Sequence, residues 1–161
     1  MAMTIYMKIK AKKQGDIDGD CTQQGREKMI LCYSMDHYVE IPRDTHTGLP
    51  TGQRIHKPLT VSTHMGKHTP KLFQACTTGE RMDVEIDMFW INEKGQEEKY
   101  FTIKLQEAIV VDAREWFPPT FLEENKPYKH MNDFSFTYET IIWTYVPDGV
   151  EAQDSWKKPA I

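Results

Sequence analysis

The segment from Met82 to Trp90 alternates apolar and acidic side chains with a period of two. The apolar set is Met82, Val84, Ile86, Met88 and Trp90, and the acidic set is Asp83, Glu85 and Asp87. This period places successive side chains on opposite faces of a β-strand, whereas a helix repeats every 3.6 residues. The segment therefore predicts a half-buried strand, and a strand of this kind needs a second layer of structure against its apolar face.

A turn and a second alternating segment follow at once. Asn92–Gly95 ends in a glycine that can adopt a positive φ, and Tyr100–Val111 then directs Phe101, Ile103 and Leu105 to one side. The two segments predict a hairpin. Further strands are predicted at Thr4–Ala11, Lys28–Ile41, Ile55–Thr63 and Phe134–Val146. A set of about six strands is enough to pack two sheets or to close a barrel.

One short helix is predicted between the strands. Thr69 is a candidate N-cap before Pro70 at the first helical position, and Gly79 ends the helix as its C′ residue. Its apolar stripe comprises Leu72, Phe73, Ala75 and Cys76. The aromatic core is predicted to include Trp90, Phe101, Phe136 and Tyr138. The helix is expected to lie on the side of a barrel or across one end.

Composition and charge limit the kinds of partner. The formal net charge of −4 and the scattered basic residues argue against a duplex nucleic-acid binder. No apolar run approaches the length of a membrane helix, and Met1–Lys13 lacks the apolar core of a signal peptide. Cys21, Cys32 and Cys76 show no CxxC spacing, which favours reduced thiols and synthesis in the cytosol. We expect one domain over residues 1–161, with Trp116–Lys129 as a surface excursion.

An acidic segment near the N-terminus has the spacing of a calcium loop. Asp16, Asp18, Asp20 and Glu27 fall at positions 1, 3, 5 and 12 of such a loop. Cys21, however, stands at position 6, where the loop needs a glycine for its sharp turn. An acidic turn between strands is the favoured interpretation.

Three histidines and two glycines are candidates for ligand-binding or catalytic residues. His56, His64 and His68 could form a metal site, but a strand end and a helix start do not place His64 and His68 on one helical face. We favour surface or locally bonded histidines. Gly48 and Gly52 lack the ending of a phosphate loop, and no Gly-x-Ser-x-Gly nucleophile motif is present. The sequence predicts no enzyme, no metal and no cofactor.

The connection between Pro42 and Ile55 is long and contains no apolar run. A hairpin needs two to five residues to reverse, and this connection spends about twelve. Long loops in a small domain are usually functional or disordered. Between Pro42 and Ile55 lie two glycines and a proline and nothing that could form a core, so we expect this 42–55 loop to protrude.

Short motifs run along the whole chain in a defined order. The most specific block is Thr47-Gly48 with Thr51–Pro58. Before it stand Gly15–Ile17 and Ile41–Asp44. After it come Pro70-x-Leu72, Thr78–Glu80, Gly95–Glu97, Tyr100-Phe101, Val110-Val111, Trp143 and Asp154–Trp156. Together and in this order, the motifs resemble the haemolysin-coregulated protein (Hcp) family, the tube subunits of the type VI secretion system.

The resemblance implies a mainly β fold, namely a two-sheet β-barrel with one short α-helix on its side and a long protruding loop. It implies a structural subunit, not an enzyme, that forms hexameric rings, stacks them into a hollow tube and carries effectors. The implied partners are further copies of the chain, sheath, spike and baseplate proteins and effectors in the lumen, with no nucleic acid and no membrane insertion. The implied location is the cytoplasm during assembly, followed by secretion without a signal peptide.

The resemblance also implies two groups of site residues. The loop residues expected at the subunit interface are Arg43, Asp44, Thr47, Gly48, Thr51, Gly52, Gln53 and Arg54. The remaining family-motif residues are His56, Lys57, Pro58, Asp154, Ser155 and Trp156.

Two alternative functions remain open at this point. The chain could be a stand-alone barrel for a small ligand, or a tube-domain effector with toxin activity. A toxin version is expected to carry an additional catalytic domain, whereas this chain stops at Ile161, about where the resemblance ends. The native mass separates a ring-forming protein from a monomeric ligand carrier.

Overall fold

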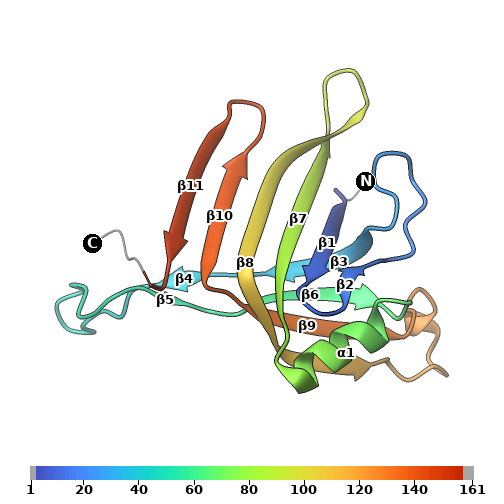
Figure 1. The fold of residues 1–161 in the computed structure, drawn as a ribbon, viewed down its shortest axis with the longest axis horizontal. Coiled ribbons are helices and arrows are strands. Elements are labelled where there is room, and N and C mark those ends of the chain that lie inside the picture. The colour runs from blue at the N-terminus through green and yellow to red at the C-terminus, as the bar shows by residue number, and fades with distance from the viewer. Residues whose placement is uncertain (1–2, 158–161) are drawn as a thin grey trace.

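The computed structural model describes residues 3–157, and its strands form a closed barrel from which a second, smaller sheet and a long hairpin extend (Figure 1). The first half contains β1 (Ile5–Ala11), β2 (Gly15–Ile17), β3 (Ile30–Asp36), β4 (Val39–Glu40), β5 (Ile55–His56), β6 (Leu59–His64) and α1 (Thr69–Thr78). The second half contains β7 (Arg81–Ile91), β8 (Glu97–Trp116), the 3-10 turn η1 (Glu123–Asn125), β9 (Met131–Thr137), β10 (Thr140–Tyr145) and β11 (Val150–Ser155).

Six antiparallel strands close the barrel in the order β8-β7-β1-β3-β6-β9 and back to β8. Apolar side chains from every wall fill the interior. The fully buried ones include Met7, Ile9, Ile30, Leu59, Met82, Ile86, Leu105, Phe134 and Phe136. A barrel of this size is filled by its own side chains, and this one therefore offers a packed core rather than a chamber for a small ligand.

Helix α1 adds to that core from the outside of the barrel. It packs against β8, with Leu72 and Ala75 fully buried and the Phe73 ring edge-on to Phe134 at 5.6 Å between centroids. Gly79 ends the helix with φ +67°, and its N–H donates to the carbonyl of Ala75. A left-handed glycine is the ordinary way to end a helix, and the predicted stripe and C-terminus are confirmed.

Strand β8 belongs to both sheets. Its first half, Phe101–Gln106, pairs with β10, which in turn pairs with β11, and its second half, from Ile109, pairs with β9. Glu107 lies where the partner changes and has φ +53°. The predicted two-sheet arrangement is confirmed, and one continuous strand joins the two sheets.

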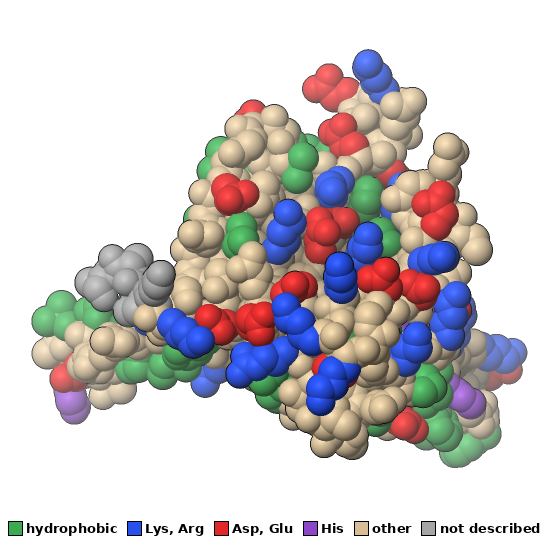
Figure 2. Space-filling model, viewed as in Figure 1, with side chains coloured by type: hydrophobic (Ala, Val, Ile, Leu, Met, Phe, Trp, Pro, Cys, Tyr) green, Lys and Arg blue, Asp and Glu red, His purple; other side chains and the backbone are tan. Residues whose placement is uncertain are grey.

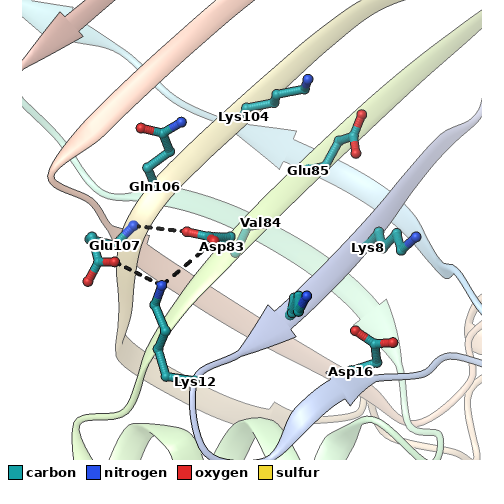
Figure 3. A pocket seen from close by; sticks show the side chains of 10 residues that line it. Lys8, Lys12, Asp16, Asp83, Val84, Glu85, Lys104, Gln106 and Glu107 are labelled. Atoms are coloured by element: carbon teal, nitrogen blue, oxygen red, sulfur yellow. Dashed lines mark hydrogen bonds and ion pairs between the residues drawn. The ribbon is translucent and has the colours of Figure 1, made fainter.

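Polar contacts hold the backbone at this change of partner. The N–H of Glu107 donates to Asp83 Oδ1 at 3.3 Å, while Lys12 Nζ lies 3.1 Å from the Glu107 carboxylate and 3.9 Å from that of Asp83 (Figure 3). These three residues stand at one end of a charged groove of about 620 Å³ on the outer face of β1, β7 and β8. Figure 2 shows basic and acidic side chains interleaved over this face, without a field of one sign.

The long hairpin continues the β3–β6 pair beyond the barrel. β4 pairs with β5 after β3 and β6 have separated, and the chain between them projects away from the rest of the molecule, at the left of Figure 1. We call residues 39–56 the arm. The predicted protruding loop is therefore the end of a two-stranded projection.

Three of the predicted strands are wrong as single elements. Lys28–Ile41 is divided between β3 and β4, Ile55–Thr63 between β5 and β6, and Phe134–Val146 between β9 and β10. In each case the chain leaves one set of partners for another. Pro58 contributes to one of these breaks because it has no N–H to donate to a ladder.

Strand β11 was not predicted, because its sequence carries no alternation. It is an edge strand that pairs only with β10, and its first four residues are exposed on both faces. Burial imposes a period of two only where one face is covered. Such a strand leaves no signal in a hydrophobic pattern.

Two local predictions are also wrong. The N-cap of α1 is His68, and Thr69 is the first helical residue. Trp90 lies outside the buried core, because β8 bulges opposite the step from Met88 to Phe89. Its ring stacks on Tyr100 at 4.5 Å and its indole N–H donates to Glu98, so the side chain packs on the surface of the hairpin.

Within residues 3–157, no helix combines the length and apolar character needed to cross a membrane.

Candidate functional site: the arm and its anchor

The tip of the arm is an ordered turn rather than a structureless loop. Asp44 Oδ1 accepts the N–H groups of His46 at 2.7 Å and Thr47 at 3.3 Å, and Gly48 closes the turn with φ +74°. The backbone N–H of Gly48 donates to the carbonyl of Asp44 at 2.8 Å. An aspartate that binds the backbone two residues on is a common turn-former. The turn explains why these positions carry these residue types.

The two sides of the tip are joined by backbone contacts. Arg43 and Pro50 form an isolated bridge, and the N–H of Thr51 donates to the carbonyl of Pro42 at 2.8 Å. Gly52 lies beside the ring of Pro42. The arm therefore has a defined shape without a core of its own.

Large apolar side chains on and beside the arm are exposed to solvent. The exposed fractions are 53% for Tyr38, 39% for Val39, 51% for Ile41, 64% for Leu49 and 38% for Ile55. Projecting apolar surface of this kind marks interaction sites in folded proteins. The arm has the composition of a surface that another molecule covers.

Arg54 ties the arm to the last strand of the protein. Its Nε donates to Asp154 Oδ2 at 2.8 Å, and one terminal nitrogen donates to Asp154 Oδ1 at 3.2 Å and to the Ser155 carbonyl at 2.7 Å. A two-pronged arginine–carboxylate pair fixes direction as well as distance. The side chains are 18% and 16% exposed, so water screens the pair less than an ordinary surface ion pair.

The Arg54 guanidinium is also the main reason that the pKa of Asp154 falls from its usual 3.8 to about 2, with His56 adding to the effect. We call Arg54, His56 and Asp154 the anchor.

His56 is the buried member of the anchor. Its Nε2 lies 2.6 Å from Asp154 Oδ2, its Nδ1 lies 2.7 Å from the Tyr138 hydroxyl, and the Trp156 ring covers it at 5.2 Å between centroids. The carboxylate can only accept, so Nε2 carries a hydrogen. Both ring nitrogens are occupied by protein groups, which leaves no free base to act on a substrate.

Tyr138 also contacts the other side of the arm. Its hydroxyl lies 2.8 Å from His37 Nε2, just before β4 begins. Burial, followed by the charge of Asp154, raises the pKa of this hydroxyl. Sequence reasoning counted Tyr138 as core, which is correct for its ring, but missed the role of its hydroxyl and missed His37 entirely.

Most of the predicted site residues fall into two groups. Those from Arg43 to Gly52 build the tip, while Arg54, His56, Asp154 and Ser155 meet at the anchor although about one hundred residues separate them in sequence. Lys57 lies beside the anchor and pairs with Glu40 at 3.3 Å, and Pro58 follows it. Gln53 is exposed. The structure thus brings two separate family motifs into one cluster.

The other candidate clusters are separate from this site. His64 and His68 meet at the far end of β6 from His56, with ring centroids 6.4 Å apart. His68 is buried and bonds to Thr63, and burial lowers its pKa to about 4. Among residues 3–157, no group of three histidine, cysteine or acidic side chains is arranged to hold a metal ion.

The acidic segment that has the spacing of a calcium loop is divided between two local structures. Asp16 belongs to β2, and Glu27 Oε1 accepts the N–H of Gly25 within its own turn.

Replacing Asp154 by Asn is expected to loosen the arm and to lower the free energy of unfolding by about 1–2 kcal/mol at pH 7. Because the pKa of Asp154 is lowered by folding, its contribution is complete above about pH 4 and is lost as the pH falls through about 2. Urea unfolding between pH 2 and 7 measures this difference. Glu151→Gln, which removes a carboxylate from the exposed part of the same strand without touching the anchor, is the matched control and should leave the arm in place. Identical acid profiles for Asp154→Asn and the parent would contradict the anchor.

A family model described as "Type VI secretion system effector, Hcp" matches residues 6–145. The chain belongs to the Hcp family. The "Major exported protein" of Pseudomonas aeruginosa is 36% identical over 99% of this chain and 98% of its own length.

Solved Hcp structures share the whole fold. One crystal structure of an Hcp protein superposes with a TM-score of 0.90 at 29% identity, covering 98% of this chain and 99% of the other. A mutant form of Hcp1 from Escherichia coli superposes with a TM-score of 0.84 at 31% identity, covering 96% and 99%. Hcp is a structural family of the type VI secretion system, so the resemblance found in the motifs is confirmed.

Proposed function

We propose that this Hcp protein is the ring-forming subunit of a type VI secretion tube. Six copies close into a ring, rings stack into a hollow tube, and the tube carries effectors while sheath, spike and baseplate proteins surround and propel it. The protein assembles in the cytoplasm and is then exported with its cargo. The similarity to a protein named for its export supports the last step.

The observation that carries the proposal is the arm. It projects beyond the barrel, exposes apolar side chains and is nevertheless held in one direction by a buried network. A projection that exposes apolar side chains and has no core of its own can bury them only against a neighbouring molecule. Contacts between two different patches of identical subunits close into rings when the rotation permits.

The packed barrel favours this function over the small-ligand alternative. Phe134 and Phe136 are fully buried in the centre, where a ligand carrier would need space. The arm and the packed barrel do not bear on toxin activity. That activity stays a separate hypothesis for any chain that joins a tube domain to a catalytic one.

Native mass spectrometry tests the proposal directly. The expected species has six times the 18.9 kDa mass of one chain, and electron microscopy is expected to show rings with a central opening. Treatment with a chelator is the control for a metal-dependent assembly and should leave the mass unchanged. A monomer at every concentration up to tens of micromolar would contradict the proposal.

A further inference from the structure

At the base of the arm, the Tyr138 hydroxyl contacts β5 and the segment that leads into β4. His37 immediately precedes Tyr38 and β4, and His56 lies in β5 opposite Val39. The hydroxyl is 2.8 Å from the His37 ring and 2.7 Å from the His56 ring. Tyr138 itself stands at the break between β9 and β10, with its ring 6% exposed in the barrel core. One side chain fixed in the body of the protein thus reaches both sides of the projection.

The hydrogen-bond network fixes the order of protons around this hydroxyl. His56 Nε2 donates to the Asp154 carboxylate, so in the neutral form of the ring Nδ1 accepts from the Tyr138 O–H. The Tyr138 oxygen then accepts from His37 Nε2–H. The Tyr138 hydroxyl and both ring nitrogens of His56 thus have partners, and satisfied polar groups of this kind rigidify their surroundings.

The arm has few other contacts that set its direction. β4 and β5 pair at only two positions, and a short two-stranded ribbon is marginal alone. The anchor holds the β5 side through His56 and Arg54, whereas the β4 side reaches the body through His37. Loss of the hydroxyl would leave two imidazoles facing each other, and the β4 side would keep only the Lys57 N–H bond to the Tyr38 carbonyl and the Lys57–Glu40 pair beside its strand pairing.

We propose that Tyr138 is the positioning residue that aims the arm for assembly, and that the arm is released when His37 and His56 are both protonated. This inference rests on the proposed ring-forming function, since aiming the arm matters only if a neighbour receives it. It adds to that function a residue outside the family motifs and a condition under which assembly weakens.

The proton count explains the release. With one imidazole protonated, the hydroxyl still donates to the neutral ring and accepts from the charged one. With both protonated, the phenolic hydrogen has no acceptor and two positive rings share one oxygen. Protonation of the second imidazole is therefore the step that breaks the contacts of the Tyr138 hydroxyl with His37 and His56.

The charged groups around His37 and His56 determine whether the arm is released at low or at high pH. Asp36 faces His37, while Asp154, itself bonded to Arg54, faces His56, and Lys57 lies on the same side. Burial, followed by the charge of His56, lowers the pKa of His37 below its usual 6.5. A histidine whose pKa is lowered by folding stabilises the folded arrangement fully above pH 6.5 and loses that contribution as the pH falls. Release is thus expected on the acid side of pH 6.5.

Tyr138→Phe tests the positioning role, because it keeps the ring in the core and removes only the hydroxyl. Amide exchange over residues 43–52 of the monomer is expected to rise about tenfold, and the dissociation constant of the ring to rise by a similar factor. Tyr145→Phe, a half-buried tyrosine on β10 without a contact to the arm, is the matched control. Equal exchange and equal assembly in Tyr138→Phe and the parent would overturn the inference.

A purely structural role for Tyr138 is separated by combining the variant with a shortened arm. The shortened variant is expected to be monomeric, so the quantity compared in it is the melting temperature. If Tyr138 acts through the arm, Tyr138→Phe weakens assembly of the full-length arm and leaves the melting temperature of the shortened variant nearly unchanged, whereas a general loss of stability lowers the melting temperature in both backgrounds. In the parent, intrinsic-rate-corrected exchange of the arm should increase between pH 7.5 and 5.5, and a flat profile would contradict the release. The exchange measurements use the monomer, so they decide this inference even if the parent never forms rings.

Discussion

Replacing residues 45–51 by a short Gly-Ser turn should abolish ring formation and leave a folded monomer. The segment carries one large apolar side chain, Leu49, which is 64% exposed and contributes nothing to the core. Halving a loop changes its closure entropy by about 0.6 kcal/mol, so the melting temperature should change little. Without the tip, the arm no longer presents its apolar surface to a neighbour.

Size-exclusion chromatography and circular dichroism melting measure the two effects separately. Leu49→Ser is the matched control, because it keeps the length and the Asp44 turn while it removes the apolar side chain at the tip. It should weaken assembly less than the shortened arm does. Tubes formed by the shortened variant, or a large fall in its melting temperature, would show that the interface lies elsewhere.

Phe134→Ala should produce the largest loss of stability, about 3–5 kcal/mol. Phe134 is fully buried and packs against Phe73 and His68 through ring edges. Trp90→Ala is the comparison that separates core from surface. Trp90 is partly exposed and contacts mainly Tyr100 and Glu98, so a loss of about 1–2 kcal/mol is expected.

Urea unfolding of both variants measures the two losses of free energy. In thermal unfolding, the Phe134 variant of a chain of this size should have a melting temperature about 10 °C below that of the parent. A tryptophan variant that loses as much stability as the phenylalanine variant would mean that the hairpin surface belongs to the core after all.

The contrast between these two aromatic residues shows what a hydrophobic pattern can predict. Alternation located β7 and the start of β8, because one face of each is buried over several residues. It failed at Trp90, where a bulge in β8 alters the register. It also failed at Tyr138-Glu139, the two residues between β9 and β10, where no glycine or proline marks the change of partner. A bulge and a change of partner depend on the neighbouring strand, which a local window does not contain.

The candidate site was predictable only in part for a similar reason. The length of the 42–55 connection indicated a projection, and Asp44 and Gly48 are ordinary turn residues. The contact between Arg54 and Asp154 joins positions about one hundred residues apart, and no spacing rule links them. The family motifs indicated that both positions matter, whereas the tertiary structure explains why they occur together. His37 carried no signal at all, because a lone histidine before a short strand is common.

The continuous course of β8 has a consequence for the accuracy of any closed assembly. A six-membered ring needs each subunit to turn the next by about 60°, and an error of a few degrees per step accumulates until the circle fails to meet and becomes an open spiral. β8 runs unbroken from the sheet that holds Asp154 into the barrel wall. Because this strand keeps the two sheets in one orientation, a hinge between them cannot absorb an error in the angle between neighbouring subunits. The angular tolerance of the circle is then set mainly within residues 39–56 and their contacts at the base, the segment in which small changes decide between closure and spiral growth.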